Sequence, residues 1–486
     1  MLFNSYTYIF FFLPAVFSIY FYLNKQRLTT ASQGVLFVAS IVFYCWWKIE
    51  YLPLILGSIL VNFYLGVSLA KQNVHGKITS KSLLIFGVTL NLVLLGFYKY
   101  TDFFIENVNS AFNQSIPLLD LTLPLAISFF TFQQIAYLVD SYRGETRDYN
   151  LLHYAVFVTF FPQLIAGPIV HHKEMMPQFD NSRNRIINAK NISRGLFVFT
   201  VGLFKKVVIA DTFAIWATSG FDEAVTLNFV DAWITSLSYT LQLYYDFSGY
   251  TEMAIGAALL FNIKLPNNFN SPYRALDIQD FWRRWHITLS RFLKEYVYFP
   301  LGGNREGKFR TYVNLMATFV LGGLWHGAGW TFIFWGFLHG AAIIFHRMWR
   351  AMGFRCHRFF AWLITFNFVN LTWVFFRAES WADAIKVLRG MFGLEGIVLP
   401  PIFAEVFSSL SKTGVRFSQD FLTISPVHDR FILILSGVLV VLLLIKWWLG
   451  RFSFKANLAV SMANSFLFVV SIIFLVRESP FLYFGF

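Results

Sequence analysis

The chain has 486 residues, of which 57% are hydrophobic and 13% charged, and its mean hydropathy is +0.56. This composition excludes a soluble domain and predicts an all-α polytopic membrane protein, because about twenty apolar residues span a bilayer as a helix. The net charge of +13 is concentrated in loops, as the positive-inside rule expects, and no nucleic-acid-binding motif accompanies it. Nucleic acid is therefore set aside as a partner.

Apolar runs continue almost from end to end, which predicts one integral-membrane domain over residues 1–486. The first run lacks a basic region before it and is followed by Lys25 and Arg27, so we predict an uncleaved span with its N-terminus outside. Cys45 and Cys356 are far apart and match no metal or redox spacing, so no disulfide is expected. Spans are predicted near residues 6–23, 33–47, 51–70, 82–98, 121–139, 195–217, 230–262, 359–376, 431–449 and 457–476.

Loop charges orient these spans. The segment Thr101–Asp120 contains no Lys or Arg and is predicted to lie outside. The run Leu151–Val170 is apolar enough to cross, but the basic stretch after it would then lie outside as well. A re-entrant segment that breaks at Gly167-Pro168 resolves this conflict. It would leave His171 and His172 at the cytoplasmic rim as solvated loop residues.

Two further regions carry charged residues inside predicted membrane spans. Lys205 and Lys206 lie inside a predicted span, where their stems either snorkel or mark a break in the helix. Asp246 lies in the long span that follows, where it either orients a histidine or braces two helices. The segment 378–430 is predicted to be largely external and partly helical.

The stretch Gly322–Trp330 contains His326 inside a long apolar run without any Asp, Glu, Lys or Arg. An ionisable side chain at bilayer depth is a functional candidate by default, although a neighbouring helix carbonyl can also satisfy it. Glycines on both sides predict a broken pair of helices, about 311–325 and 328–346. A second histidine, His286, lies in a basic, aromatic stretch that we place on the cytoplasmic side, partly dipping into the membrane.

Several motifs give the sequence a resemblance to a known family. They are Tyr244-Tyr245-Asp246-Phe247-Ser248-Gly249-Tyr250, Asn268-Phe269-Asn270-Ser271-Pro272-Tyr273, Tyr298-Phe299-Pro300-Leu301-Gly302-Gly303-Asn304-Arg305, Trp373-Val374-Phe375-Phe376-Arg377-Ala378 and the two histidine stretches. Together they resemble the membrane-bound O-acyltransferases (MBOAT), in particular the bacterial branch that acetylates exported polysaccharides. The resemblance implies that fold, with roughly 11–13 membrane helices and re-entrant segments around a central tunnel. The core with both histidines would cover about 121–378.

Acyl transfer to a hydroxyl needs a base near the acceptor oxygen, and neutral histidine suits that task. The resemblance implies that His326 is this general base. It marks His286 as a second position, which either positions the donor or steadies the site, or else has a purely structural role. We expect His339 to serve packing. No metal is required.

The resemblance suggests acetyl-coenzyme A as a cytoplasmic donor that is not permanently bound. Arg283, Arg284 and Arg305 are candidates to attract its phosphates, although basic loops equally bind the headgroups of membrane lipids. The motif Gly302-Gly303-Asn304 is expected to be a turn rather than a phosphate loop. In the aromatic tail 477–486, Tyr483 is either an acyl shuttle, as the resemblance implies, or part of an interfacial anchor.

These features predict an O-acetyltransferase of a bacterial inner (cytoplasmic) membrane. The resemblance implies that it acts with a periplasmic serine-type, SGNH-like partner on a polysaccharide acceptor such as alginate, peptidoglycan or cellulose. A membrane transporter or flippase is the alternative, because broken helices and polar residues at depth are also transporter traits. Against it, no inverted repeat is visible in the sequence. A non-catalytic scaffold of an envelope complex is a third possibility.

Overall fold

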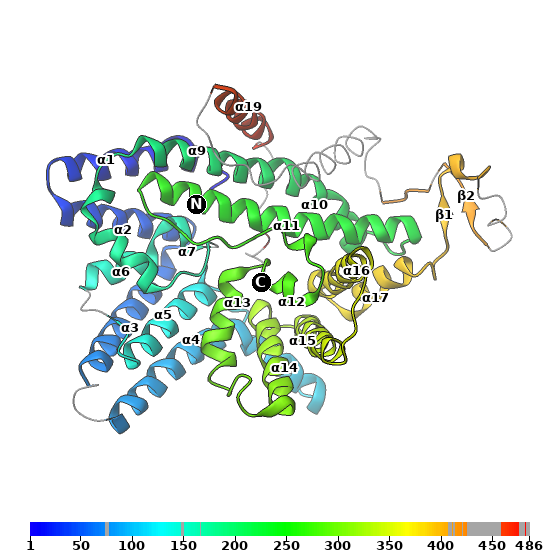
Figure 1. Cartoon of the computed structure of the whole chain (residues 1–486), viewed down its shortest axis with the longest axis horizontal. Coiled ribbons are helices and arrows are strands. Elements are labelled where there is room, and N and C mark those ends of the chain that lie inside the picture. The colour runs from blue at the N-terminus through cyan, green and yellow to red at the C-terminus, as the bar shows by residue number, and fades with distance from the viewer. Residues whose placement is uncertain are drawn as a thin grey trace. The chain divides into compact units, whose positions relative to one another are not determined.

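A computed structural model describes residues 1–72, 77–146, 150–165, 167–406, 411, 414–419, 421–424, 458–475 and 482 (Figure 1). The chain forms two compact units that interleave in sequence. Unit 1 holds residues 1–202, 250–354 and 480–486, and unit 2 holds residues 203–249 and 355–479. The prediction of one domain stays a prediction, and each unit is described by itself below.

Unit 1 begins with long apolar helices. The π-helix η1 (Thr7–Phe12) continues into α1 (Leu13–Lys25), and α2 (Thr29–Cys45), α3 (Leu52–Gln72) and α4 (Lys77–Phe112) follow. Within the described residues, four helical stretches are long and apolar enough to cross a membrane: Thr7–Lys25, Ile49–Lys71, Ser80–Phe112 and Arg358–Arg377. The described part thus agrees with a polytopic membrane protein, while the total number of spans stays a prediction.

Buried amide side chains form hydrogen bonds between the helices of unit 1. Such bonds matter in lipid because apolar packing alone does little to specify how two helices pair. The Asn91 side chain on α4 donates to the side-chain oxygen of Asn62 on α3 over 2.6 Å, and Asn62 donates back over 3.3 Å. Ser58 on α3 donates to the side chain of Gln134 on α5 (Ile127–Tyr142). Polar contacts of this kind fix the register of membrane helices.

The re-entrant prediction is supported by a broken segment. Helix α6 (Leu151–Thr159) spans only nine residues, too few to cross, and stops at Phe160 before the short α7 (Phe161–Leu164). The chain then passes Gly167 and reaches α8 (His172–Asp180). The helix therefore breaks earlier than Gly167-Pro168, because the non-helical backbone at Phe160 (ψ 106°) already ends it.

Unit 2 contains a buried ion cluster. Helix α9 (Ala189–Phe204) leads into the π-helix η4 (Lys205–Ala210), α10 (Asp211–Thr218) and the π-helix η5 (Ser219–Glu223). Lys206 lies 2.8 Å from Asp211 and 2.6 Å from Asp246, which is on α11 (Phe229–Leu260). Lys206 thus does not snorkel: the irregular helix turns its amine inward, and Asp246 braces η4 against α11.

The rest of unit 2 holds α16 (Arg358–Arg377), α17 (Trp381–Met391) and α19 (Leu458–Phe474). Two short parallel strands, β1 (Val398–Leu399) and β2 (Arg416–Phe417), pair in the segment predicted to be external. That segment was expected to be partly helical, and the strands were not foreseen. The predicted span 431–449 lies outside the described residues. Cys45 and Cys356 are both free, as expected.

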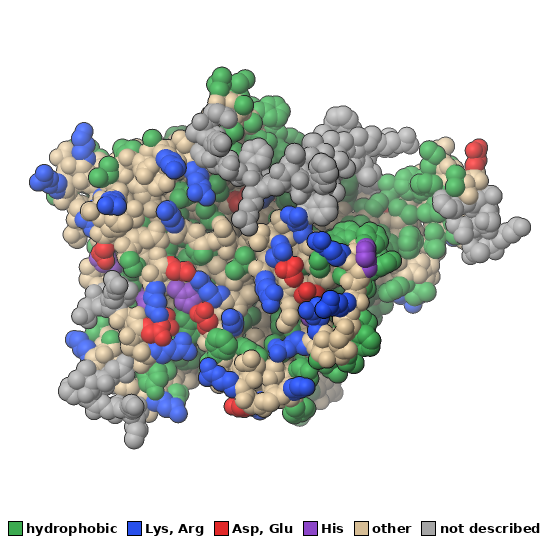
Figure 2. Space-filling model, in the orientation of Figure 1, with side chains coloured by type: hydrophobic (Ala, Val, Ile, Leu, Met, Phe, Trp, Pro, Cys, Tyr) green, Lys and Arg blue, Asp and Glu red, His purple; other side chains and the backbone are tan. Residues whose placement is uncertain are grey.

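The last part of unit 1 follows α11 in the chain. It contains the short helices α12 (Ile278–Trp282) and α13 (Ile287–Leu293), the π-helix η7 (Lys294–Tyr298), and the hairpin of α14 (Gly307–His326) and α15 (Trp330–Ala351). Gly302 and Gly303 have positive φ angles of 103° and 60°, so Gly302-Gly303-Asn304 forms the expected turn. Figure 2 shows many Lys and Arg side chains on the face that carries this segment.

Candidate active site

The hairpin of α14 and α15 places His326 at a helix end. Helix α14 stops at His326, and the link 327–329 leads directly into α15. Glycines permit this tight hairpin. A Cβ on Gly323 would lie 2.3 Å from the carbonyl oxygen of Phe332, and one on Gly336 would lie 2.4 Å from that of Phe319. The two helices therefore approach backbone to backbone, and the position of His326 is fixed by their contact.

The imidazole of His326 is 3% exposed and lies between two indole rings. Its ring centroid is 5.0 Å from that of Trp325 and 5.2 Å from that of Trp335, both with edge-on geometry. His326 nevertheless borders empty space. It lines a pocket of about 500 Å³ together with Lys99, Leu123, Leu125, Ala126, Ile127, Ser128, Phe129, Ile165 and Trp325. His326 is thus not sealed in solid packing.

The end of α14 is held by two neighbouring side chains of α4. The amine of Lys99 donates to the carbonyl oxygens of Trp325 (2.6 Å) and His326 (3.0 Å). The hydroxyl of Tyr100 donates to the carbonyl oxygen of Leu324 over 2.8 Å. The last carbonyls of a helix have no intrahelical partner, so these bonds satisfy groups that would otherwise be buried without one.

His286 occupies a strained backbone position. Its φ of 42° is in the left-handed region, which is costly for a residue with a Cβ. Two backbone hydrogen bonds hold it there: Ile287 N–H donates to the carbonyl of Asn268, and Asn270 N–H donates to the carbonyl of Arg284. The segment 268–270 therefore acts as a strap across the start of α13.

The strap also fixes which ring nitrogen of His286 carries a proton. The side-chain oxygen of Asn268 accepts from the backbone N–H of Thr288 (3.2 Å) and from its hydroxyl (2.9 Å). A backbone N–H only donates, so this Asn268 atom is the acceptor oxygen. The Nδ1 of His286, 3.1 Å from the same oxygen, must then be the N–H donor. In the neutral ring Nε2 is left as the basic nitrogen.

The two predicted histidines meet at one tryptophan. The ring centroid of Trp325 lies 5.0 Å from that of His326 and 6.3 Å from that of His286. His339 was expected to serve packing. Its Nδ1 accepts a hydrogen bond from the indole N–H of Trp282 over 3.2 Å, and its ring makes an edge-to-face contact with Trp335. The structure therefore brings His286 and His326 to the same place and gives His339 a bond that orients its ring.

The three predicted phosphate-binding arginines differ in availability. Arg283 and Arg305 are exposed. Arg284 is half-buried, donates to both carboxylate oxygens of Asp280 (2.9 Å each) and reaches the carbonyl of Asn270. Its charge is largely neutralised by Asp280. Tyr483, the predicted acyl shuttle, lies outside the described residues.

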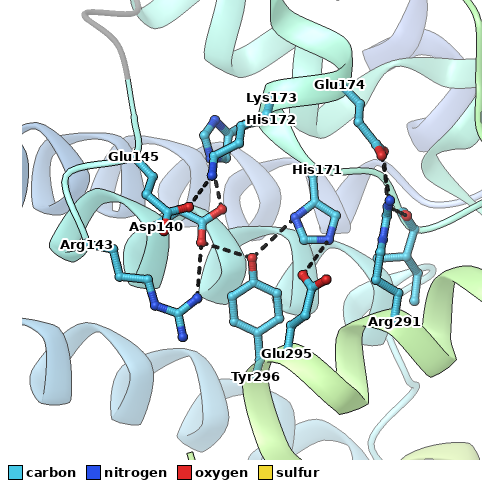
Figure 3. Close-up of polar contacts among 11 residues, drawn as sticks. Asp140, Arg143, Glu145, His171, His172, Lys173, Glu174, Arg291, Glu295 and Tyr296 are labelled. Atoms are coloured by element: carbon cyan, nitrogen blue, oxygen red, sulfur yellow. Dashed lines mark hydrogen bonds and ion pairs between the residues drawn. The ribbon is translucent and has the colours of Figure 1, made fainter. Parts of the chain in front are cut away.

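A polar cluster missed by the sequence analysis joins α5, α8 and the segment of α13 and η7 (Figure 3). His172 contacts Asp140 over 3.0 Å, and the Tyr296 hydroxyl donates to Asp140 over 3.0 Å. Tyr296 also lies 3.2 Å from His171 Nδ1, while Arg291 pairs with Glu174. His171 and His172 are 9% and 1% exposed. The expectation of solvated loop histidines is therefore wrong, because Asp140 and Tyr296 hold them inside.

Burial controls the protonation of this cluster. Burial, and after it the positive charge of Arg291, lowers the pKa of His171 to about 4, so its ring is neutral at pH 7. For Glu174, burial acts to raise the pKa, but the hydrogen bond and charge of Arg291 outweigh it and the pKa lies below its usual value. The cluster thus ties α8 to α13 with a charged pair and a neutral histidine.

The comparison with known families now decides the class of protein. The family model of the membrane-bound O-acyltransferases matches residues 41–379, which include the strap, both histidines and Lys99. The chain belongs to the membrane-bound O-acyltransferase family. This membership makes it an enzyme that transfers an acyl group to an oxygen atom, and it confirms the resemblance seen in the sequence motifs.

Relatives support the same assignment. The chain is 51% identical over 446 residues to the peptidoglycan O-acetyltransferase of Helicobacter pylori, which covers 85% of this chain and 84% of the relative. It is 40% identical over 402 residues to the probable alginate O-acetylase of Pseudomonas aeruginosa, covering 81% and 75%. A more distant relative, the teichoic acid D-alanyltransferase of Bacillus subtilis, is 27% identical over 223 residues, covering 44% and 56%.

Proposed function

We propose that this O-acyltransferase moves acetyl groups from acetyl-coenzyme A to the hydroxyl groups of a cell-envelope polysaccharide, with His326 as the general base. One observation carries the proposal: His326 lines a pocket of about 500 Å³ whose other lining residues are mainly apolar. Such a pocket offers a small acyl group a mainly apolar environment beside His326.

The chemical step follows from neutral imidazole beside that pocket. His326 takes the proton of the acceptor hydroxyl as the oxygen attacks the thioester carbonyl. A C–O bond forms, the C–S bond breaks, and the imidazolium returns its proton to the thiolate that leaves. A positioned base of this kind contributes roughly 10²–10⁴-fold to the rate.

His286 is proposed as the second functional histidine. Asn268 holds its Nδ1–H, so the basic Nε2 is kept in one orientation, and the ring lies beside Trp325, which His326 also contacts. This geometry supports a role in placing the donor or steadying the site. It also explains why a strained backbone angle is maintained at this residue.

The donor is proposed to enter from the cytoplasmic side, where activated acyl groups are made. Arg283 and Arg305 are exposed in the basic segment between α12 and α14 and are suited to attract the phosphates of coenzyme A. Arg284 contributes less because Asp280 neutralises it. Headgroups of membrane lipids are alternative ligands of the same side chains.

The identity of the acceptor is inferred from the relatives. Two of them are named for peptidoglycan and alginate acetylation, so we infer an exported polysaccharide as the final acceptor. A bacterial inner membrane is the corresponding location. A periplasmic serine-type, SGNH-like enzyme would complete transfer to the sugar, and Tyr483 in the C-terminal tail would relay the acetyl group to it.

The test uses purified protein reconstituted in liposomes with radiolabelled acetyl-coenzyme A. Wild type is expected to release coenzyme A and to label a hydroxyl acceptor, and His326→Ala to lose at least a factor of about 100 in turnover. His357→Ala, which changes an exposed histidine of unit 2, is the control. Near wild-type turnover by a folded His326→Ala protein would remove His326 from the mechanism. If wild type cleaves no acetyl-coenzyme A with any acceptor, the proposal that acetyl-coenzyme A is the donor is contradicted.

A further inference from the structure

A buried lysine lies beside the proposed base. Lys99 is on α4, within a helix long enough to span the membrane, where a cationic side chain is costly and usually functional. Among the described residues, no carboxylate lies within ion-pair distance of its amine. Its contacts are instead the carbonyl oxygens of Trp325 and His326. These form the negative end of the α14 dipole, which favours a cation.

Lys99 also faces the pocket that His326 lines. Both residues, with Trp325 and Ser128, form its polar wall, and leucine, isoleucine, alanine and phenylalanine side chains form the rest. A second pocket of about 710 Å³ shares Lys99 and Leu123 with the first, and Asp102, Leu121 and Gly327 belong to its lining. Asp102 belongs to the segment predicted to lie outside. Lys99 therefore lines both the pocket that contains the proposed base and a second pocket that contains a residue of the segment predicted to lie outside.

We propose that Lys99 is a catalytic residue whose ammonium group binds the carbonyl oxygen of the acyl group that His326 helps to transfer. This inference rests on the proposed function. As the acceptor oxygen attacks the thioester carbon, the carbonyl π electrons move onto its oxygen, and the N–H of Lys99 stabilises the negative charge there. The charge returns to the carbonyl when the C–S bond breaks, so Lys99 neither gains nor loses a proton.

The chain offers a control for the purely structural role of Lys99. Tyr100 is the next residue, and it also donates to a terminal carbonyl of α14, that of Leu324. Tyr100 is not among the residues that line either pocket. If Lys99 only holds the end of α14, removing either donor should have a similar effect. If Lys99 acts on the acyl oxygen, its loss should reduce turnover far more.

The experiment measures kcat and the KM for acetyl-coenzyme A in liposomes for wild type, Lys99→Met, Lys99→Arg and Tyr100→Phe. Loss of one donor to a developing oxyanion costs about 10²–10³ in kcat, so we expect that loss for Lys99→Met, a KM within a few-fold of wild type, and less than a fivefold loss for Tyr100→Phe. Equal losses for Lys99→Met and Tyr100→Phe would overturn the proposal. An inactive wild type would instead overturn the proposed function.

Lys99→Arg keeps the test decisive if the methionine variant does not fold. Arginine retains the charge, so the proposal expects it to keep at least tenfold more activity than Lys99→Gln, which can still donate to a carbonyl. Size-exclusion elution and thermal unfolding establish that both variants are folded. Equal activity of folded Lys99→Arg and Lys99→Gln would show that the charge is not needed, and would refute the proposal.

Discussion

The side-chain oxygen of Asn268 and the Nδ1 of His286 lie 3.1 Å apart, and this bond determines the tautomer of a buried histidine. The oxygen is itself placed by Thr288, whose hydroxyl accepts the backbone N–H of Ile169 over 3.0 Å. A four-residue relay thus connects the re-entrant segment to His286. Partners behind a functional side chain commonly fix its orientation in this way.

We therefore expect Asn268→Ala to lower kcat at least tenfold, because His286 loses its orienting acceptor. Asn268→Asp keeps an acceptor for Nδ1–H and should retain more activity than the alanine variant. Asn270→Ala is the matched control: its side chain is exposed, and its hydrogen bonds to Arg284 use only its backbone N–H and carbonyl. Steady-state kinetics in liposomes measure all three. Equal activity of Asn268→Ala and Asn270→Ala would exclude a role for the bond.

Much of the helical framework could be predicted because its signals are local. The hydropathy of the long runs, the glycines around His326 and the pair Gly302-Gly303 each act within a few residues. The predicted break at 326–327 accordingly corresponds to the end of α14 at His326 and the start of α15 at Trp330. The motifs also indicated the family, which the comparisons confirm.

Contacts between distant segments could not be predicted. Hydropathy ended the fourth span at residue 98, one position before Lys99, whereas α4 continues to Phe112. The contact of Lys99 with Trp325 joins residues 226 positions apart, and no local pattern encodes it. His171 and His172 were misjudged for the same reason, since Asp140 and Tyr296 come from other helices. For the contact of Lys99, the only signal in the sequence was the position of this lysine directly after an apolar run.

The ion cluster of unit 2 should be important for stability. Lys206 is 2% exposed and pairs with both Asp211 and Asp246, so Lys206→Met removes a buried cation that two buried carboxylates contact. Breaking a buried ion pair on one side costs about 3–5 kcal/mol. We expect a lower midpoint of thermal unfolding in detergent. Lys205→Met, next to the cluster and half-buried, is the control, and an equal effect of both variants would contradict the assignment.

Acidification should weaken the packing of α8. The pKa of His171 is about 4 in the folded protein and 6.5 in its unperturbed state, so the unfolded chain binds more protons below pH 6.5. Its stabilising contribution is complete above pH 6.5 and is lost as the pH falls toward 4, by up to about 2 kcal/mol between pH 7 and 5. Thermal unfolding of wild type and His171→Gln at both pH values tests this. An unchanged pH dependence in the variant would contradict it.

The close approach of α14 and α15 makes a final prediction possible. Gly323→Ala would place a methyl group 2.3 Å from the carbonyl oxygen of Phe332, so the two helices must separate and His326 must shift. A displacement of about 1 Å at a reacting group can cost 10²-fold in rate, and we expect a loss of that order in kcat. Gly329→Ala is the matched control within the same hairpin. Its φ of −165° suits any residue, and its Cβ would meet nothing closer than 3.5 Å. If Gly323→Ala retains the turnover of Gly329→Ala, the position of His326 does not depend on the backbone contact between the two helices.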